Sequence, residues 1–169
     1  MATHTERHAH QVTQIEVVLE VSHAAFTRAF ESLVPQMSVE LFGELPSLSP
    51  QVARERLASG VGPLGFVLFQ KLDHGVIVTA LAGNRCEATT YVFGNALIAV
   101  EMTRHVARAG LYVPLRLFVE AVAAERVRVT YDLPSSLMAP FGSAEVDKVA
   151  LGLDEKLERL LEETAKTSA

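Results

Sequence analysis

Among the side chains that could do chemistry, His105 has the most suggestive surroundings. The pattern predicts a helix over residues 96–109, in which His105 follows Met102 by three residues and Ile98 by seven, at the border of the apolar stripe. Glu101, one turn earlier, could orient the imidazole through a hydrogen bond. A histidine near a helix C-terminus is favoured by the helix dipole and can bind the end carbonyls. The same position would also suit an axial ligand of haem iron.

The haem hypothesis uses a small set of residues. His105 is the preferred axial ligand to the iron and His74 the second choice, with Met102 and Phe93 among the pocket walls. His74 also follows Asp73 at the end of a predicted strand, where an Asp–His pair could be half of an acid/base device. Because neighbours in sequence tend to point apart, Asp73 is better explained as a helix cap.

Polar residues near the ends of predicted elements are candidates for a small-ligand pocket. They are Asn95, Tyr112, Arg116, Tyr131, Asp132 and Ser135. A hydrolase using Asp132 with Ser135 or Ser136 is a distant third hypothesis, because no histidine can be placed beside either serine from the sequence. Pro134 favours a strand exit with turns at this point.

The chain has no dinucleotide-binding, phosphate-loop, nucleophile-elbow, zinc-protease or paired-cysteine motif. Gly60-Val61-Gly62 is followed by Pro63, whose missing amide spoils a phosphate cradle. Cys86 is predicted on the inner face of a strand, where thiols are usually inert packing residues. The sequence leaves open whether the protein is an enzyme.

Composition limits the class of protein. The 169 residues carry a net charge of −5, which argues against nucleic acid as a partner. No window approaches the roughly 18 apolar residues of a membrane span. The lone Cys86 allows no intrachain disulfide, and the first residues lack a secretory apolar region, so we expect a cytoplasmic protein. The mean hydropathy of +0.24 could reflect a subunit interface, so a homodimer is expected.

Periodicity predicts alternating strands and helices. Ile15, Val17 and Leu19 alternate with polar residues, which indicates a half-buried strand. The chain begins with a strand over 14–21 and a helix from Ser22 to Pro35, followed by an insertion or lid over 36–63 with a short helix near 50–57. Next come a strand over 65–72, a segment 74–81 that suits either helix or strand, a strand over 85–93 and the helix over 96–109. Strands near 115–120 and 126–131 and a helix over 144–163 complete the order.

This order predicts the α+β class: about five antiparallel strands with helices packed on one face. We expect one domain over 13–164, with disordered tails at 1–12 and 165–169.

Several short runs together resemble a known family. They are Leu72-Asp73-His74-Gly75, Phe93-Gly94-Asn95, Met102-Thr103-Arg104-His105, Gly110-Leu111-Tyr112-Val113-Pro114-Leu115-Arg116, Tyr131-Asp132-Leu133-Pro134-Ser135-Ser136 and Leu153-Asp154-Glu155-Lys156-Leu157. Their order and spacing over residues 64–161 resemble the family catalogued as domain of unknown function 302, and the strand–helix unit at 15–34 fits its beginning. The resemblance implies a fold akin to the TATA-binding protein and no established activity.

The chain departs from the family pattern in three places. Ala96 stands where a proline commonly follows Gly-Asn, and residues 36–63 are enlarged. Leu115 stands where many members carry a cysteine, which weakens a thiol-based role carried over from them.

Two functions from different classes therefore remain. One is a non-catalytic domain that binds a small ligand or associates with itself. The other is a haem-binding protein or haem enzyme with His105 as the preferred ligand.

Overall fold

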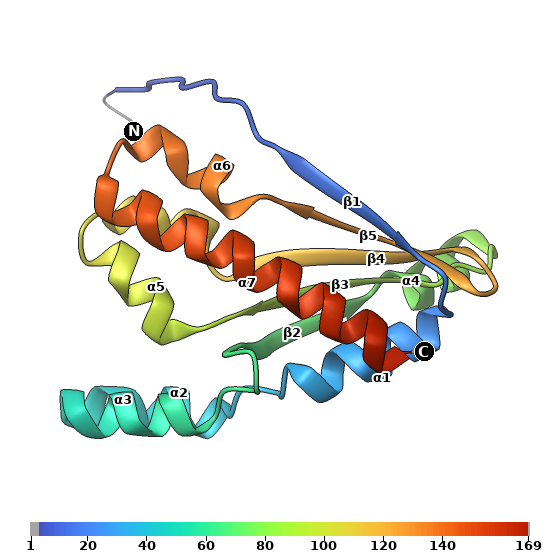
Figure 1. Cartoon of the computed structure of the whole chain (residues 1–169), viewed down its shortest axis with the longest axis horizontal. Helices are drawn as coiled ribbons and strands as arrows, with labels where there is room; N and C mark the ends of the chain where they lie inside the picture. The colour runs from blue at the N-terminus through green and yellow to red at the C-terminus, as the bar shows by residue number, and fades with distance from the viewer. Residues whose placement is uncertain (1–3, 169) are drawn as a thin grey trace.

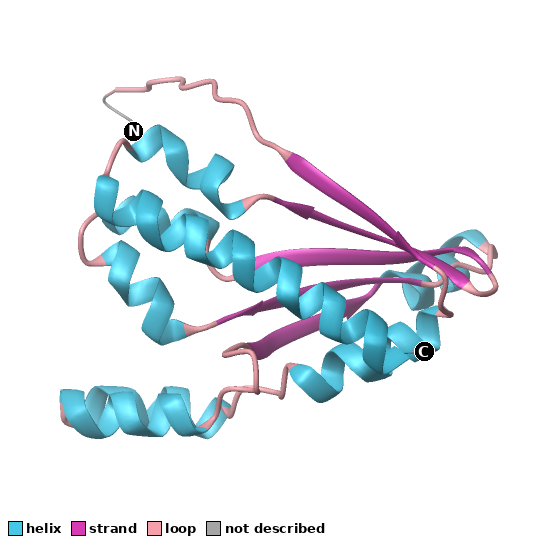
Figure 2. Ribbon diagram, viewed as in Figure 1, coloured by secondary structure: helices cyan, strands magenta, loops and turns pink. Residues whose placement is uncertain are grey.

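Five strands form a single antiparallel sheet in the order β1-β5-β4-β3-β2 (Figures 1 and 2). The computed structural model describes residues 4–168. The strands are β1 (Gln14–Leu19), β2 (Val67–Asp73), β3 (Ala88–Gly94), β4 (Leu115–Ala123) and β5 (Arg126–Asp132). The predicted α+β class with an antiparallel sheet is confirmed.

Seven α-helices accompany the sheet within residues 4–168. They are α1 (His23–Leu33), α2 (Val39–Glu44), α3 (Pro50–Ser59), α4 (His74–Ala82), α5 (Ala96–Thr103), α6 (Pro134–Met138) and α7 (Ala144–Ser168), with short 3-10 turns at 45–47, 107–112 and 139–141. Side-chain caps mark the start of several of these helices. The side chains of Ser22, Asp73 and Asn95 accept hydrogen bonds from amides of the first turns of α1, α4 and α5. The open choice for 74–81 is therefore resolved as a helix. None of the described helices is long and apolar enough to cross a membrane.

The two faces of the sheet differ in character. In β4, Leu115, Leu117 and Val119 are buried against the helices. Arg116 and Phe118 alternate with them and face the other side. We call this second side the open face.

The main core lies between the sheet, α1 and α7. In Figure 1, α7 crosses the sheet with its C-terminal end beside α1. The buried stripe of α7 consists of Val146, Ala150, Leu153, Leu157, Leu160 and Leu161. Phe30 of α1 is fully buried, with its ring 4.5 Å from that of Tyr91 and 5.4 Å from that of Phe93. These contacts cover the centre of one face of the sheet with helices.

Helices α2 and α3 form an arm beside the edge strand β2. Figure 1 shows this arm extending away from the rest of the molecule. The backbone at Gln36 bridges Leu68, and a second small core joins Met37 and Leu41 to Val67. Helix α3 has no buried residue. The segment expected as an insertion over 36–63 is thus mainly helical and is attached through few buried side chains.

Helix α5 is shorter than predicted. It ends at Thr103, and the predicted stretch up to residue 109 continues as a turn and a 3-10 helix over 107–112. Val106 takes an extended conformation, and Ala109 beyond it is fully buried. Core packing here overrides the local helix propensity. Gly110, which follows the predicted helix, lies inside the 3-10 helix and has no positive φ.

The residues near the two ends of the chain differ in structure. Residues 4–13 form neither helix nor strand, and residues 1–3 lie outside the described part of the chain. At the other end α7 continues to Ser168, so residues 165–168 are helical and not a tail. Thr164 is fully buried there, and its hydroxyl donates to the Leu160 carbonyl at 2.7 Å, which supports the extra turn. Residue 169 lies outside the described residues.

Two leucines of α7 test the importance of its buried stripe. Leu160 is fully buried, whereas Leu151 on the same helix is 57% exposed. We expect Leu160→Ala to lower the free energy of unfolding by about 2–5 kcal/mol, because it removes buried contacts and leaves a cavity. Leu151→Ala should change it by less than about 0.5 kcal/mol. Urea unfolding followed by circular dichroism measures both, and equal losses would contradict this packing.

Candidate functional site

An apolar hollow lies between the arm and the body of the protein. Its volume is about 290 Å³. Its walls come from α2, β2, the β3–α5 junction, α5, the segment after the 3-10 helix, and α7. The lining residues are Phe42, Phe69, Gly94, Asn95, Ala96, Ile98, Ala99, Met102, Val113, Pro114, Leu115 and Leu153. We call this the apolar cavity.

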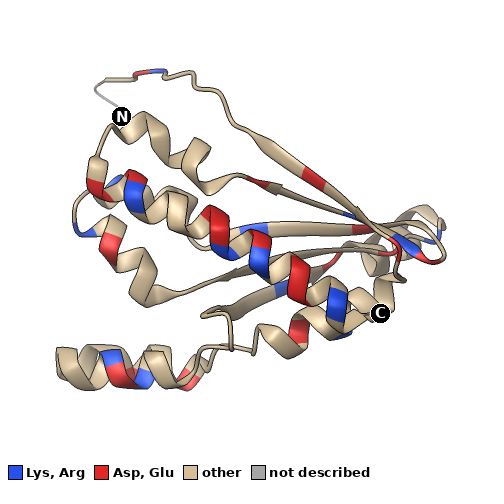
Figure 3. Ribbon diagram, viewed as in Figure 1, with Lys and Arg blue, Asp and Glu red and all other residues tan. Residues whose placement is uncertain are grey.

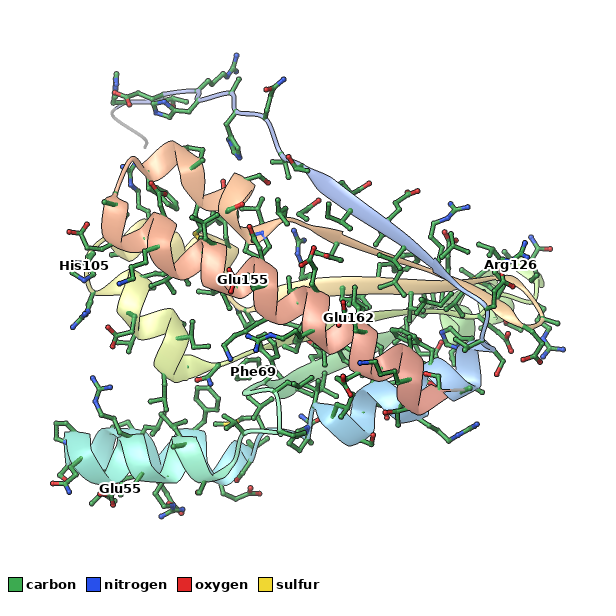
Figure 4. All side chains as sticks on the ribbon, in the orientation of Figure 1. Glu55, Phe69, His105, Arg126, Glu155 and Glu162 are labelled. Carbon is green, nitrogen blue, oxygen red and sulfur yellow. The ribbon has the colours of Figure 1, made fainter. Side chains whose placement is uncertain are left out.

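Phe69 reaches the cavity because β2 contains a bulge. The pairing of β2 with β3 shifts register between Leu68 and Gln70, which leaves Phe69 without a partner opposite it. A bulge re-aims the side chain of the extra residue. The Phe69 ring lies 5.9 Å from that of Phe42 on the arm, and Figure 4 shows it between the sheet and the arm. The two rings join the arm to the body at the cavity wall.

Asn95 supplies the polar edge of the cavity and is already well bonded. Its Oδ1 accepts from the amides of Leu97 at 2.8 Å and Ile98 at 3.4 Å, as expected of a helix cap. Its Nδ2 donates to the Gly65 carbonyl at 2.8 Å. The amide therefore fixes the start of α5 against the loop that precedes β2. A ligand in the cavity would meet carbon atoms on nearly every side.

The other predicted pocket residues do not reach the apolar cavity. Tyr112, Arg116 and Asp132 line a separate, narrow cavity of about 40 Å³. Tyr131 is 5% exposed, and burial raises the pKa of its hydroxyl. Arg116, Tyr131 and Asp132 also border a shallow depression on the open face. Of the predicted set, only Asn95 belongs to the apolar cavity.

The serines after β5 have structural partners. The amide of Ser135 donates to Oδ1 of Asp154 at 3.0 Å. The hydroxyl of Ser136 donates to the Leu133 carbonyl at 2.8 Å and accepts from the Thr13 amide at 2.9 Å. Pro134 starts the short helix α6, where the sequence pattern predicts turns. Within residues 4–168, no hydrogen bond joins either serine to a histidine, so the arrangement needed for hydrolysis is not assembled.

The prediction that His105 borders the interior is wrong. Because α5 ends two residues earlier, His105 is exposed in the turn that follows. Figure 4 shows it at the outer end of α5. Glu101 does not orient the imidazole, because its carboxylate forms an ion pair with Arg104. His105 lines neither the apolar cavity nor any of the other clefts described here.

The remaining residues of the haem hypothesis lie apart from one another. Met102 is fully buried and lines the apolar cavity, whereas Phe93 is buried in the main core beside Phe30. His74 is at the start of α4, with its Nε2 2.8 Å from the Thr90 hydroxyl on the open face. Between residues 4 and 168, no three His, Cys, Asp or Glu side chains are grouped to hold a metal ion. The residues proposed for an iron site therefore do not form one pocket.

Cys86 and His23 border a wider, open cleft near α4. Cys86 precedes β3 and is only partly buried, so its predicted place on the inner face of a strand is wrong. The cleft also includes Asp73 and Glu87. His23 Nε2 lies 3.3 Å from the buried Thr89 hydroxyl. Burial lowers the pKa of the His23 imidazole below its ordinary value of 6.5, against the opposing effect of the two carboxylates.

Sequence reasoning missed most of the cavity wall. Phe69, Ile98, Ala99 and Leu153 are ordinary apolar residues of predicted strands and helices. Nothing in the sequence distinguishes an apolar side chain that lines a cavity from one that fills a core. The bulge at Phe69 is seen only in the pairing of β2 with β3.

Comparison with known proteins identifies the family of the chain. The family model described as "Domain of unknown function DUF302" matches residues 44–164. The chain belongs to the DUF302 family. The DUF302 match begins at the end of α2 and includes all of α3. The part of the arm that follows residue 44 therefore lies within the matched region.

A solved DUF302 structure has the same fold. The crystal structure of an uncharacterized conserved DUF302 protein from Bacillus stearothermophilus matches with a TM-score of 0.62 and 12% identity, over 89% of this chain and 96% of that one. At this identity the likeness shows the fold alone. No curated protein matches the chain. The likeness to the TATA-binding protein stays a prediction.

The environment of His23 makes a testable contribution to acid stability. With its pKa lowered by burial, the folded state binds fewer protons than the unfolded state just below pH 6.5. The stabilisation is therefore present above pH 6.5 and is lost as the pH falls through the folded pKa. We expect His23→Gln to flatten this part of the stability profile, measured by urea unfolding between pH 7 and 5.

The exposed His8 provides the control. His8→Gln should leave the profile unchanged. An NMR titration that gave His23 a pKa at or above 6.5 would contradict its partial burial.

Proposed function

We propose that this protein binds a small hydrophobic molecule in the apolar cavity. The observation that carries the proposal is a 290 Å³ hollow whose walls are almost entirely carbon and whose one side is the arm. Ligand sites are typically concave and mostly apolar, with few polar groups, and begin at about 300 Å³. Apolar cavities enclosed by aliphatic and aromatic side chains stay dry and take up apolar molecules.

The arm gives a ligand its route of entry to the cavity. Phe42 is 45% exposed although its ring contacts Phe69, and α3 behind it buries no side chain. Elements with few buried apolar contacts open at low free-energy cost. In this proposal the predicted lid role of residues 36–63 belongs to α2 and α3. A ligand between Phe42 and Phe69 would strengthen the contact of the arm with the body.

The proposal assigns no catalytic step, because the groups that line the cavity cannot transfer a proton or attack a substrate. Asn95 is the one polar side chain there, and its amide is engaged at both ends. The expected cytoplasmic location remains part of the proposal, supported by the lone Cys86.

Filling the cavity tests the proposal directly. Ala99 lines the cavity, whereas Ala58 is exposed on α3. We expect wild-type protein to bind the neutral dye Nile red with increased fluorescence. Ala99→Leu should weaken binding roughly tenfold, because the added carbons occupy the space that the dye needs; tenfold corresponds to about 1.4 kcal/mol. Ala58→Leu is the control and should bind as wild type does.

Two results would contradict cavity binding. One is an absence of dye binding by the folded wild-type protein. The other is equal weakening by Ala99→Leu and Ala58→Leu.

A second proposal concerns the open face, which fits another copy of this chain. Val18 is 52% and Leu72 40% exposed on it, and the ring of Phe118 is only partly buried. Single apolar residues at a surface are ordinary, but here they share one face of a sheet. The first turn of α4 extends this face, since the His74 ring packs against Phe118 at 5.9 Å.

Charges on the open face favour a two-fold partner. Positive Arg116 and Arg128 alternate with negative Glu16, Glu120 and Asp132 across the strands. Two copies related by a two-fold axis can therefore set opposite charges against each other. Strands about 4.8 Å apart and about 20 Å long give five of them a face of roughly 500 Å². Side-chain relief and α4 extend this toward the ~800 Å² per partner of a stable interface.

Substitution of one exposed residue distinguishes the open face from other surfaces. We expect sedimentation equilibrium to show a wild-type dimer and Val18→Asp to be monomeric, because a carboxylate would be buried without a partner. Val39→Asp is the matched control, since Val39 is 78% exposed on the arm. A monomeric wild type, or dimers that survive Val18→Asp, would contradict the proposed interface.

A further inference from the structure

A second hollow lies next to the apolar cavity and has a different chemistry. This cleft, of about 300 Å³, lies between the loop over residues 61–65 and α7. The loop contributes Val61, Gly62, Pro63, Leu64 and Gly65 to it, and α7 contributes Lys156 and Arg159. We call it the basic cleft. Both of its charged side chains are cationic.

The apolar cavity and the basic cleft meet at one hydrogen bond. Asn95 lines the cavity and Gly65 lines the cleft, and the 2.8 Å bond from Asn95 Nδ2 to the Gly65 carbonyl joins them. A β-carbon on Gly65 would lie 3.4 Å from Lys156 Nζ and 4.0 Å from Asn95 Nδ2. The ammonium group is therefore a near neighbour of the polar edge of the cavity.

Helix α7 also contributes side chains to both hollows. Leu153 lines the apolar cavity, and Lys156 lines the basic cleft three residues later. Residues three apart lie on the same side of a helix. Arg159 extends the series by three more residues. Lys156 thus neighbours Leu153 on α7, and Arg159 lies farther around the helix, about 120° from Leu153.

The two cations have no acidic partner. Within residues 4–168, neither Lys156 nor Arg159 forms an ion pair, whereas Lys166 farther along the same helix pairs with Glu163 at 2.7 Å. Lys156 Nζ has only the Leu64 carbonyl, at 3.4 Å. Figure 3 shows acidic and basic residues interspersed along α7, so the overall charge of the helix does not explain this.

Asp154 on this part of α7 accepts a hydrogen bond from the Ser135 amide at 3.0 Å. Burial raises the pKa of the Tyr131 hydroxyl, and the charges of Glu158 and Asp154 add to this effect. Figure 4 shows Glu155 and Glu162 on the solvent side of the helix. Lys156 and Arg159 are the side chains of α7 that line the cleft beside the loop over residues 61–65.

The loop that completes the cleft is held in place by its glycines. A β-carbon at Gly62 would lie 2.1 Å from the Leu33 carbonyl, so only glycine allows the loop to approach the end of α1 this closely. Gly65 has a φ of +80°, and its amide donates to the Gly62 carbonyl at 2.8 Å. The backbone wall opposite Lys156 is therefore fixed in the absence of any ligand.

We propose that the ligand of the apolar cavity is an amphipathic anion. Its alkyl or acyl chain occupies the apolar cavity, and its carboxylate or phosphate head binds Lys156 and Arg159 in the basic cleft. The inference rests on the proposed function and specifies the class of ligand. The head group would replace the long contact between Lys156 and the Leu64 carbonyl with a charge-assisted hydrogen bond, which is stronger than one between neutral groups.

Calorimetric titration with decanoate and decanol tests the inference, because these ligands share a chain and differ in head charge. We expect the wild-type protein to bind decanoate about tenfold more tightly than decanol. Lys156→Gln should weaken decanoate binding about tenfold and leave decanol binding unchanged. Arg159→Gln should act in the same direction. Lys166→Gln, on the same helix outside the cleft, should change neither affinity.

The outcomes separate this inference from the proposed function. Equal affinities for decanoate and decanol in the wild type, or equal losses of both in Lys156→Gln, would overturn the anionic ligand while leaving hydrophobic binding intact. No binding of either compound would overturn both. Co-sedimentation with anionic lipid vesicles without decanoate binding would show that the cations attract a membrane surface, and would also overturn the inference.

Discussion

The apolar side of α7 lies across the buried face of the sheet, and most other elements take their positions from that contact. Leu157 and Leu160 are almost fully excluded from water there, together with Phe30 from α1. Burial of this kind contributes about 25 cal/mol per Å² of apolar surface. Because α7 is fixed over its whole length, Leu153 and Lys156 have fixed places beside the two hollows.

The apolar cavity occurs where two separately packed units meet. The main core ends near Met102 and Leu153, and the small core under the arm ends near Phe69. The main core is closely packed, whereas the arm leaves apolar side chains such as Phe42 partly exposed. Such a boundary can remain partly unfilled without unfolding either unit, since the arm is attached by few buried contacts.

Two surfaces of the molecule thus differ in what they can do. The hollows on the helical side present carbon walls followed by two cations that lack acidic partners, which suits a small amphipathic molecule. The open face presents both signs of charge among exposed apolar residues, which suits a second copy. The exposed His105 belongs to neither surface.

The sequence by itself determined the class of fold. Strict alternation in β4 and β5, the capping residues Ser22 and Asn95, and the stripe of α7 are local patterns, and each depends on neighbours within a few residues. The structure shows the same patterns, because burial of the apolar side chains requires them. The same reasoning failed at residues 104–109, where packing of Ala109 in the core ended the helix early.

Only the tertiary structure decided which residues share a site. The bulge that turns Phe69 toward Phe42 depends on pairing with β3, and the meeting of Asn95, Gly65 and Lys156 joins three segments far apart in sequence. Neither contact leaves a periodic signal. A histidine near a helix end has the same sequence pattern whether the chain beyond it turns toward the core or toward solvent. The location of His105 could therefore be decided only from the positions of α7 and the sheet. Sequence fixes which side chains must avoid water, whereas the close approach of distant segments fixes where a ligand can bind.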